Sequence, residues 1–230
     1  RNSFGWQRRE FVAAPLLLDA QHGRVLVPTG FGVVVALELA SGELVWRTEY
    51  EPIPLPKTRT YSMPRRKFTW LTPALLVVGD TLLVTSPDSA ELLALDVADG
   101  HELWRRSASE LSALDPVTAT LTFDHLIGAQ DGVLYLGGAK LSALEIVGGL
   151  RSPSSPVPLW TRPVEHPERC GRARLADDVL LLPGPGGTLL FERESGEPRG
   201  SFEHADALGL LPTAEALFVL LPHELRRIER

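Results

Sequence analysis

The chain has a single cysteine, a single methionine and a single asparagine among its 230 residues. One cysteine, Cys170, excludes an internal disulfide, so cysteine usage does not reveal the redox compartment. No apolar run approaches the roughly 20 residues that a membrane-spanning helix needs, so we predict no membrane span. A basic excess is also missing: 23 Lys and Arg stand against 29 Asp and Glu, a net charge of −6. This acidity argues against a general nucleic-acid-binding protein.

The chain is otherwise composed like an ordinary globular protein, with 44% hydrophobic and 23% charged residues. Its 20 glycines and 19 prolines are enough to separate many short elements, which favours β-structure. The length is sufficient for a substantial hydrophobic core in one large domain or two small ones.

An internal repeat organises the sequence. Residues 36–46 read Ala-Leu-Glu-Leu-Ala-Ser-Gly-Glu-Leu-Val-Trp, and residues 94–104 read Ala-Leu-Asp-Val-Ala-Asp-Gly-His-Glu-Leu-Trp. A third, degenerate copy begins at 143–146 and ends with Pro-Leu-Trp at 158–160. A fourth runs over 190–196, with Phe202 at the tryptophan position. A sequence motif that recurs in this way along the chain is typical of propellers and other arrays of supersecondary units.

Each copy follows a second apolar strand and a tight turn, so each unit contains three or four short antiparallel strands. The inner strands are almost continuously apolar, which is typical of strands buried on both faces. We therefore predict an all-β fold, a β-propeller or propeller fragment of about five four-stranded antiparallel blades in a single domain over residues 1–230. The predicted blades are about 11–49, 72–106, 121–162, 171–203 and 207–229.

The repeat residues have structural roles in this interpretation. Glycine is expected in the turn before each outer strand because that turn needs a positive φ. Tryptophan is expected to cover the gap between neighbouring sheets with a large apolar area. The predicted structural residues are Gly42, Trp46, Gly100, Trp104, Trp160 and Gly196.

The two ends of the chain leave two interpretations open. Residues 4–9 resemble an isolated outer strand, with Trp6 at the tryptophan position, and the last hairpin ends before an outer strand. Residues 4–9 could complete the last blade and close a five-bladed ring. Alternatively, both ends cut through a larger propeller, and the chain is then part of a longer protein.

The pattern Ala-Leu-acid-x-x-x-Gly-x-x-x-Trp, preceded by a Val/Leu strand, resembles the quinoprotein-type (PQQ-like) repeat. That repeat occurs in pyrroloquinoline-quinone dehydrogenases and in the non-enzymatic BamB-like branch of outer-membrane assembly proteins. The resemblance covers about residues 11–230 and implies a propeller. It also implies a periplasmic or extracytoplasmic location, because such repeats are commonly exported. Family members usually have seven or eight blades, so five hairpins depart from the pattern.

The enzymatic branch implies a metal ion with carboxylate and amide ligands, a catalytic aspartate and often adjacent cysteines. This chain has no cysteine pair, and its one asparagine lies near the N-terminus. The repeat acids Glu38, Asp96, Glu145 and Glu192 are interpreted as turn and edge hydrogen-bonding groups. We predict no catalytic residues and no bound cofactor, and we retain a quinone-dependent dehydrogenase, or a fragment of one, as the alternative.

Other patterns associated with chemistry are incomplete. His166 and Cys170 supply two possible ligands, too few for a closed zinc site, so no metal is predicted. Residues 184–187 are glycine-rich but lack the following Lys-Ser/Thr of a phosphate-binding loop. They are interpreted as a hairpin turn.

One basic and aromatic segment differs from the rest of the chain. Residues 57–70 carry five positive charges and no acid, so the remainder of the chain has a net charge of −6 − 5 = −11. The segment connects the first blade to the second, and loops on rigid scaffolds often carry binding residues. The alternative is a solvated loop with its aromatic rings tucked onto the blade. The candidate partner-binding residues are Lys57, Arg59, Tyr61, Arg65, Arg66, Lys67, Phe68 and Trp70.

The function predicted from these patterns is a non-catalytic propeller scaffold for protein or ligand interaction, with no nucleic acid bound. A protein partner or a neighbouring domain is expected at residues 57–70. A second, Pro/Ser-rich insertion at 148–158 is a weaker candidate. A ligand-sensing module attached to a signalling domain is a further alternative.

Overall fold

The computed structural model describes residues 16–52, 74–86, 88–89, 91–107, 110–111, 123–146, 149–151, 157–165, 170–184, 186–204, 209–213, 215–221 and 223–229. Five antiparallel sheets follow one another through these residues, and within each sheet the strands are ordered as they are in the sequence. We number them sheets 1 to 5.

The strand bounds follow the repeat. Sheet 1 contains β1 (Leu17–Asp19), β2 (Arg24–Pro28), β3 (Val33–Glu38) and β4 (Leu44–Glu49). Sheet 2 contains β5 (Ala74–Val78), β6 (Thr81–Thr85), β7 (Glu91–Asp96) and β8 (Glu102–Ser107). Sheet 3 contains β9 (Phe123–Gln130), β10 (Val133–Gly138), β11 (Lys140–Glu145) and β12 (Val157–Pro163). Sheet 4 contains β13 (Arg174–Ala176), β14 (Val179–Gly184), β15 (Gly187–Glu192) and β16 (Pro198–Glu203). Sheet 5 contains β17 (Gly209–Pro212), β18 (Ala216–Leu220) and β19 (Leu225–Glu229).

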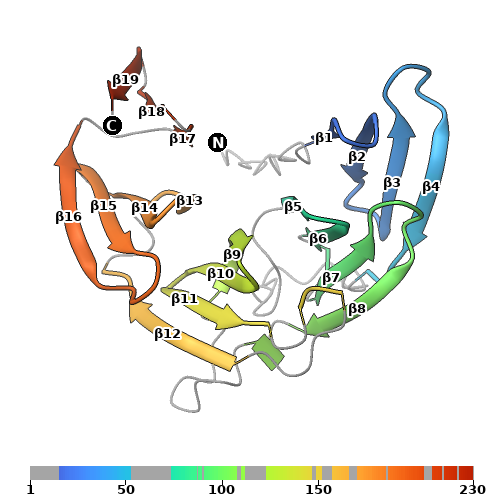
Figure 1. Cartoon of the computed structure of the whole chain (residues 1–230), viewed down its shortest axis with the longest axis horizontal. Helices are drawn as coiled ribbons and strands as arrows, with labels where there is room; N and C mark the ends of the chain where they lie inside the picture. Colours follow the sequence, from blue (N-terminus) through green and yellow to red (C-terminus); the bar gives the residue numbers. More distant parts are fainter. Residues whose placement is uncertain are drawn as a thin grey trace, which may run out of the picture.

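The sheets radiate from a common centre. The first strand of each sheet lies innermost and the fourth outermost, so the described residues form an open arc (Figure 1). Successive inner strands are in contact: β1 with β5, β5 with β9, β9 with β13, and β13 with β17. The arc opens between sheet 5 and sheet 1. The predicted propeller-type architecture is therefore confirmed.

Apolar clusters lie between successive sheets, and together they form the core. One cluster joins sheets 1 and 2, one joins sheets 2 and 3, one joins sheets 3 and 4, and one joins sheets 4 and 5. All five residues of β6 are buried because sheet 2 is covered on both faces. The outer strand β4 buries only Trp46 fully. Burial on both faces thus explains why the inner strands read as continuous apolar runs.

Sheet 5 has three described strands, and β19 is its last. Residues 4–9, which close a ring in one of the two interpretations of the chain ends, lie outside the described residues, and so does most of the insertion at 148–158. The proposal that residues 4–9 close a ring therefore remains a prediction.

Candidate functional site

The chain crosses from one sheet to the next at one end of the sheets. Val33 pairs with Glu49, so the β2–β3 turn and the end of β4 lie at the same end of sheet 1. Glu91 pairs with Ser107 in the same way at the end of sheet 2. We call the surface formed by residues 29–32, 50–52, 86, 88–89, 107 and 110–111 the connection face.

A buried polar cluster joins sheets 1 and 2 at the connection face. The Tyr50 hydroxyl donates to Oδ1 of Asp88 over 2.7 Å, and the Gly32 amide donates to Oδ2 over 2.8 Å. The Ser86 hydroxyl also donates to Asp88. Tyr50 is only 4% exposed. Its burial raises the pKa of the phenol above the ordinary range, and the Asp88 carboxylate adds to this rise, so Tyr50 remains a proton donor.

This cluster, which we call the Tyr50 clasp, holds the chain at the point where it leaves sheet 1. All eight predicted partner-binding residues, Lys57 to Trp70, lie in 53–73 and therefore outside the described residues. The residues on either side of 53–73 are described and show where the chain leaves sheet 1 and where it enters sheet 2. It leaves the outermost strand of sheet 1 through Tyr50 and Pro52, and it returns at Ala74 in the innermost strand of sheet 2.

One exposed aromatic side chain at the connection face was not predicted from the sequence. Phe31 is 78% exposed and lies in the β2–β3 turn between Gly30 and Gly32, whose φ angles are 71° and 76°. A Cβ atom at Gly32 would lie 2.9 Å from the Tyr50 carbonyl oxygen, so the turn packs closely against the start of the connection. The sequence Gly-Phe-Gly could have indicated this exposed ring, because a glycine on each side favours a tight turn that carries the phenylalanine.

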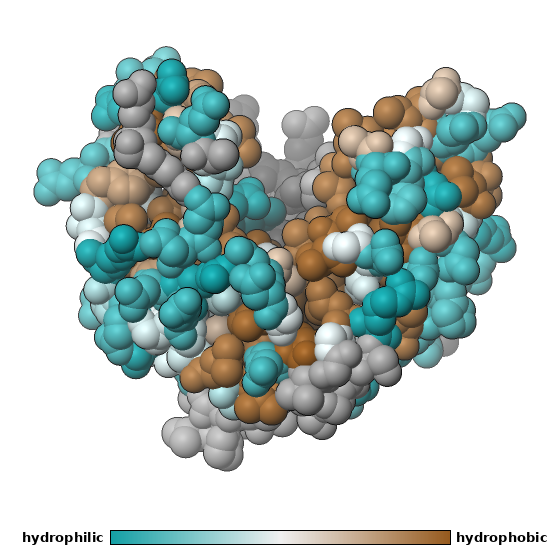
Figure 2. All heavy atoms as spheres, viewed as in Figure 1, coloured by the Kyte–Doolittle hydropathy of each residue, from teal (hydrophilic) through white to brown (hydrophobic). Residues whose placement is uncertain are grey.

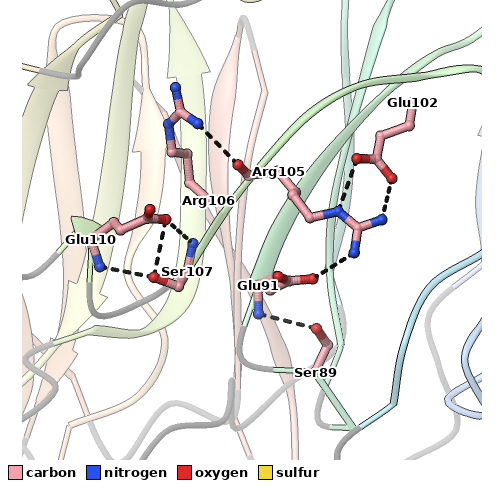
Figure 3. A network of polar contacts seen from close by, with 7 residues as sticks. All are labelled: Ser89, Glu91, Glu102, Arg105, Arg106, Ser107 and Glu110. Atoms are coloured by element: carbon pink, nitrogen blue, oxygen red, sulfur yellow. Dashed lines mark hydrogen bonds and ion pairs between the residues drawn. The ribbon is translucent and has the colours of Figure 1, made fainter.

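Sheet 2 carries a charged network at its edge (Figure 3). Arg105 Nε donates to Glu102 over 2.8 Å, and Arg105 Nη1 reaches Glu91 over 3.2 Å. The hydrogen bonds from Arg105 hold the pKa of the Glu102 carboxyl below its usual range. Ser107 and Glu110 close a short turn beside this network. Since the side chains are partly exposed, the network orders the strand ends and adds little stability.

The repeat tryptophans and glycines meet at the opposite end of the sheets. The Trp46 indole N–H donates to the Val97 carbonyl of sheet 2 over 3.0 Å. A Cβ atom at Gly100 would lie 2.5 Å from the Trp46 ring, and Gly100 has φ +75°. The tryptophan of one sheet therefore packs on the glycine of the next sheet. We call such a glycine, with the carbonyl group three residues before it, a tryptophan socket.

The same contact recurs between sheets 3 and 4. Trp160 donates to the Arg193 carbonyl over 3.0 Å and packs on Gly196, which has φ +69°. Trp104 donates instead to the Leu150 carbonyl over 2.6 Å, next to Gly149, in the degenerate third copy. The contacts of these tryptophans hold neighbouring sheets together, which is the structural role that the sequence predicted.

The repeat acids stabilise their own turns. Ser41 donates to Glu38 over 2.7 Å, and Ser195 donates to Glu192 over 2.8 Å. The amide of Ala98 donates to Asp96 over 2.8 Å. No group of three His, Cys, Asp or Glu side chains that could hold a metal ion occurs among the described residues. Three of the four repeat acids, Glu38, Asp96 and Glu192, are thus engaged in hydrogen bonds of their own turns, as the sequence predicted.

The whole arrangement matches one family. The family model described as "Outer membrane protein assembly factor BamB" matches residues 5–199. This chain belongs to the BamB family. No curated protein matches the sequence significantly. In the described part of this BamB-family chain, no helix is long and apolar enough to cross a bilayer.

Solved structures with low sequence identity share the fold of this BamB-family chain. BamB from Moraxella catarrhalis is 16% identical, with a TM-score of 0.51, over 95% of this chain and 73% of that chain. PorZ, described as a surface component of the type-IX secretion system of Porphyromonas gingivalis, is 17% identical, with a TM-score of 0.57, over 95% of this chain and 26% of PorZ. The computationally designed protein Ika8 is 8% identical, with a TM-score of 0.54, over 94% of this chain and 57% of Ika8.

Proposed function

We propose that this chain is a non-catalytic propeller scaffold that binds a protein partner at its connection face. The observation that carries the proposal is the division between the two ends of the sheets. At one end, the described tryptophans and repeat acids are engaged in contacts between and within sheets. At the other end, the Tyr50 clasp and the exposed ring of Phe31 lie where the chain leaves sheet 1, a few residues before the basic segment 57–70 in the sequence.

The charge distribution supports an acidic partner. Residues 57–70 carry five positive charges on a chain whose net charge is −6. A polarised surface of this kind favours association with carboxylate-rich surfaces and orients the encounter. Phe31 adds an apolar contact of the type found at the centre of interfaces. The partner we expect is therefore a protein segment that combines acidic and aromatic side chains.

We further propose an extracytoplasmic location. Support comes from the description of the matched family as an outer-membrane assembly factor. The printed description of PorZ as a bacterial surface component of a secretion system points in the same direction.

Binding of an acidic probe peptide tests the proposal. The probe is a fluorescein-labelled peptide of alternating Glu and Phe, and its anisotropy is measured in low and physiological salt. Replacing Arg65, Arg66 and Lys67 with Ser removes three ion pairs worth about 0.5 kcal/mol each. The loss of about 1.5 kcal/mol corresponds to roughly tenfold weaker binding.

The control variant replaces Arg47, Arg199 and Arg226 with Ser. These arginines lie at exposed positions of β4, β16 and β19. Both variants lose three positive charges, so their net charges are equal. It should bind the probe as the unmodified chain does. Equal weakening in both variants would show that net charge alone attracts the peptide and would contradict the proposed site. Stoichiometric uptake of pyrroloquinoline quinone with Ca²⁺, read from its absorbance, would contradict the non-catalytic role.

A further inference from the structure

One leucine is uncovered in the seam between sheets 3 and 4, although its equivalent is buried in the seam between sheets 1 and 2. Leu189 of β15 and Leu93 of β7 occupy equivalent positions, since each stands seven residues before the glycine of a tryptophan socket. Leu93 is 2% exposed, whereas Leu189 is 43% exposed. Figure 2 shows hydrophobic residues among hydrophilic ones on the arm that sheets 4 and 5 form. Leu189 lies on the face of sheet 4 that is turned to sheet 3, because Phe191, two residues along the strand, belongs to the apolar cluster between these sheets.

The residue that directly follows the outer strand explains this difference. Tyr50 follows β4 and Val164 follows β12, and the amide of each donates to a carbonyl group in a turn of its own sheet, over 2.8 Å and 3.0 Å. Tyr50 belongs to the same apolar cluster as Leu93, so its ring helps to cover that leucine. Valine is much smaller than tyrosine, and Val164 therefore leaves Leu189 open to solvent.

A ring occupies the same position in the seam between sheets 4 and 5. His204 directly follows β16, its amide donates to a carbonyl group of the β14–β15 turn over 3.2 Å, and it is 7% exposed. The corresponding residue of sheet 2 lies outside the described residues. The third strand of sheet 4 also begins with Gly187, where that of sheet 2 begins with Glu91, so the position next to Leu189 on this face carries no side chain. We call the site formed by Val164, Gly187 and Leu189 the Leu189 gap.

Two carboxylates stand at the outer rim of the Leu189 gap. Glu165 directly follows the valine of the gap, and Glu203 pairs with its glycine; both glutamates are exposed. Arg162 of β12 also reaches sheet 4, but its guanidinium already donates to the carbonyl groups of residues 195 and 196 and pairs with Glu197. The rim therefore favours a positively charged group on whatever enters the gap.

We propose that the Leu189 gap binds an aromatic side chain of a protein partner that carries Lys or Arg next to this ring. The ring takes the place that Tyr50 has between sheets 1 and 2, and the neighbouring Lys or Arg pairs with Glu165 and Glu203. Aromatic side chains that fill such gaps are typical anchors of protein interfaces. Phenylalanine fits better than tyrosine, because the turn of sheet 4 at 184–187, Gly-Pro-Gly-Gly, has no carboxylate in the role of Asp88. The site does not depend on residues 57–70, so it stands apart from the proposed acidic-partner site.

Two short peptides test the proposal. The probe is fluorescein-labelled Ser-Lys-Phe-Lys-Ser, and the comparison peptide replaces its phenylalanine with alanine. Fluorescence anisotropy at physiological salt gives the dissociation constant of each peptide for the 230-residue chain. We expect the alanine peptide to bind roughly tenfold more weakly or worse, because it lacks the buried ring. A third peptide, Ser-Glu-Phe-Glu-Ser, should also bind more weakly, since its acids face Glu165 and Glu203.

Variants of the chain locate the binding. Val164→Tyr supplies a ring from the chain itself, as Tyr50 does between sheets 1 and 2, and should abolish binding of the probe. Leu189→Ala keeps the gap open but removes apolar contact, and it should weaken binding several-fold. Leu44→Ala is the matched control, because Leu44 is a 57% exposed leucine of β4, and it should bind the probe as the unmodified chain does.

The outcomes separate this proposal from its alternatives. Equal binding of the phenylalanine and alanine peptides overturns it, and so does equal binding by the Leu189→Ala variant and the unmodified chain. Leu189→Ala decides the test if Val164→Tyr does not fold. Self-association of the unmodified chain that disappears in Val164→Tyr, measured by size-exclusion chromatography, also overturns it, because a second copy would then fill the gap. The Glu/Phe probe of the preceding section reports on residues 57–70, so either proposal can fail alone.

Discussion

At the scale of single residues, the tryptophan and glycine of the repeat act across sheets. The two residues stand four positions apart in the first two copies, and the sequence predicted a turn at the glycine and a tryptophan that covers the gap between neighbouring sheets. The structure pairs Trp46 of the first copy with Gly100 of the second. A glycine is required at position 100 for two reasons. Its φ of +75° disfavours any side chain, and the Trp46 ring occupies the space that a Cβ atom would take. Spacing could predict the turn but not its partner in another copy.

The double requirement at Gly100 predicts a large loss of stability. Gly100→Ala should cost about 1 kcal/mol for the left-handed conformation and about 1–3 kcal/mol more for overpacking against Trp46. Gly23→Ala is the control, because Gly23 has φ +63° and open space around its Cβ position. Urea unfolding should therefore show a loss near 1 kcal/mol for Gly23→Ala and a clearly larger one for Gly100→Ala. Equal losses would mean that the Trp46 contact adds nothing.

At the scale of secondary-structure elements, the sequence was informative where burial is regular. The inner strands could be recognised because burial on both faces removes polar residues, as in β6. The outer strands could be recognised because one tryptophan stands among exposed residues, as in β4. The Tyr50 clasp could not be predicted, since it joins Tyr50, Gly32 and Asp88 through a tertiary contact between two turns. No sequence period relates these three residues.

The clasp predicts a loss of stability at high pH. The ordinary pKa of tyrosine is 10.0, and burial raises the pKa of Tyr50 above it in the folded chain. The stabilising contribution is complete below pH 10 and decreases as the pH rises above 10, because the unfolded chain then releases a proton that the folded chain retains. Unfolding in urea at pH 8 and pH 11 should show a smaller decrease for Tyr50→Phe than for the unmodified chain. Identical decreases would show that Tyr50 is not responsible.

At the scale of the whole molecule, the sheets build a rigid arc with different roles for its two ends. One end holds the tryptophan sockets between sheets, and the other carries the connections, the Tyr50 clasp and Phe31. The propeller architecture could be predicted because the repeat recurs along the chain. The contacts of the connection face could not be predicted, because the turns that form it have no repeating pattern, and residues 57–70 lie outside the described residues.

The dissociation constant of the Glu/Phe probe peptide, compared between two variants, tests this division of roles most directly. Trp46→Phe weakens the seam between sheets 1 and 2, and it should lower the urea midpoint while leaving the dissociation constant unchanged. Replacing Arg65, Arg66 and Lys67 with Ser should leave the midpoint unchanged and weaken binding roughly tenfold. Weaker binding in a folded Trp46→Phe variant, together with unchanged binding in the triple variant, would contradict the separation of a structural end from a binding end.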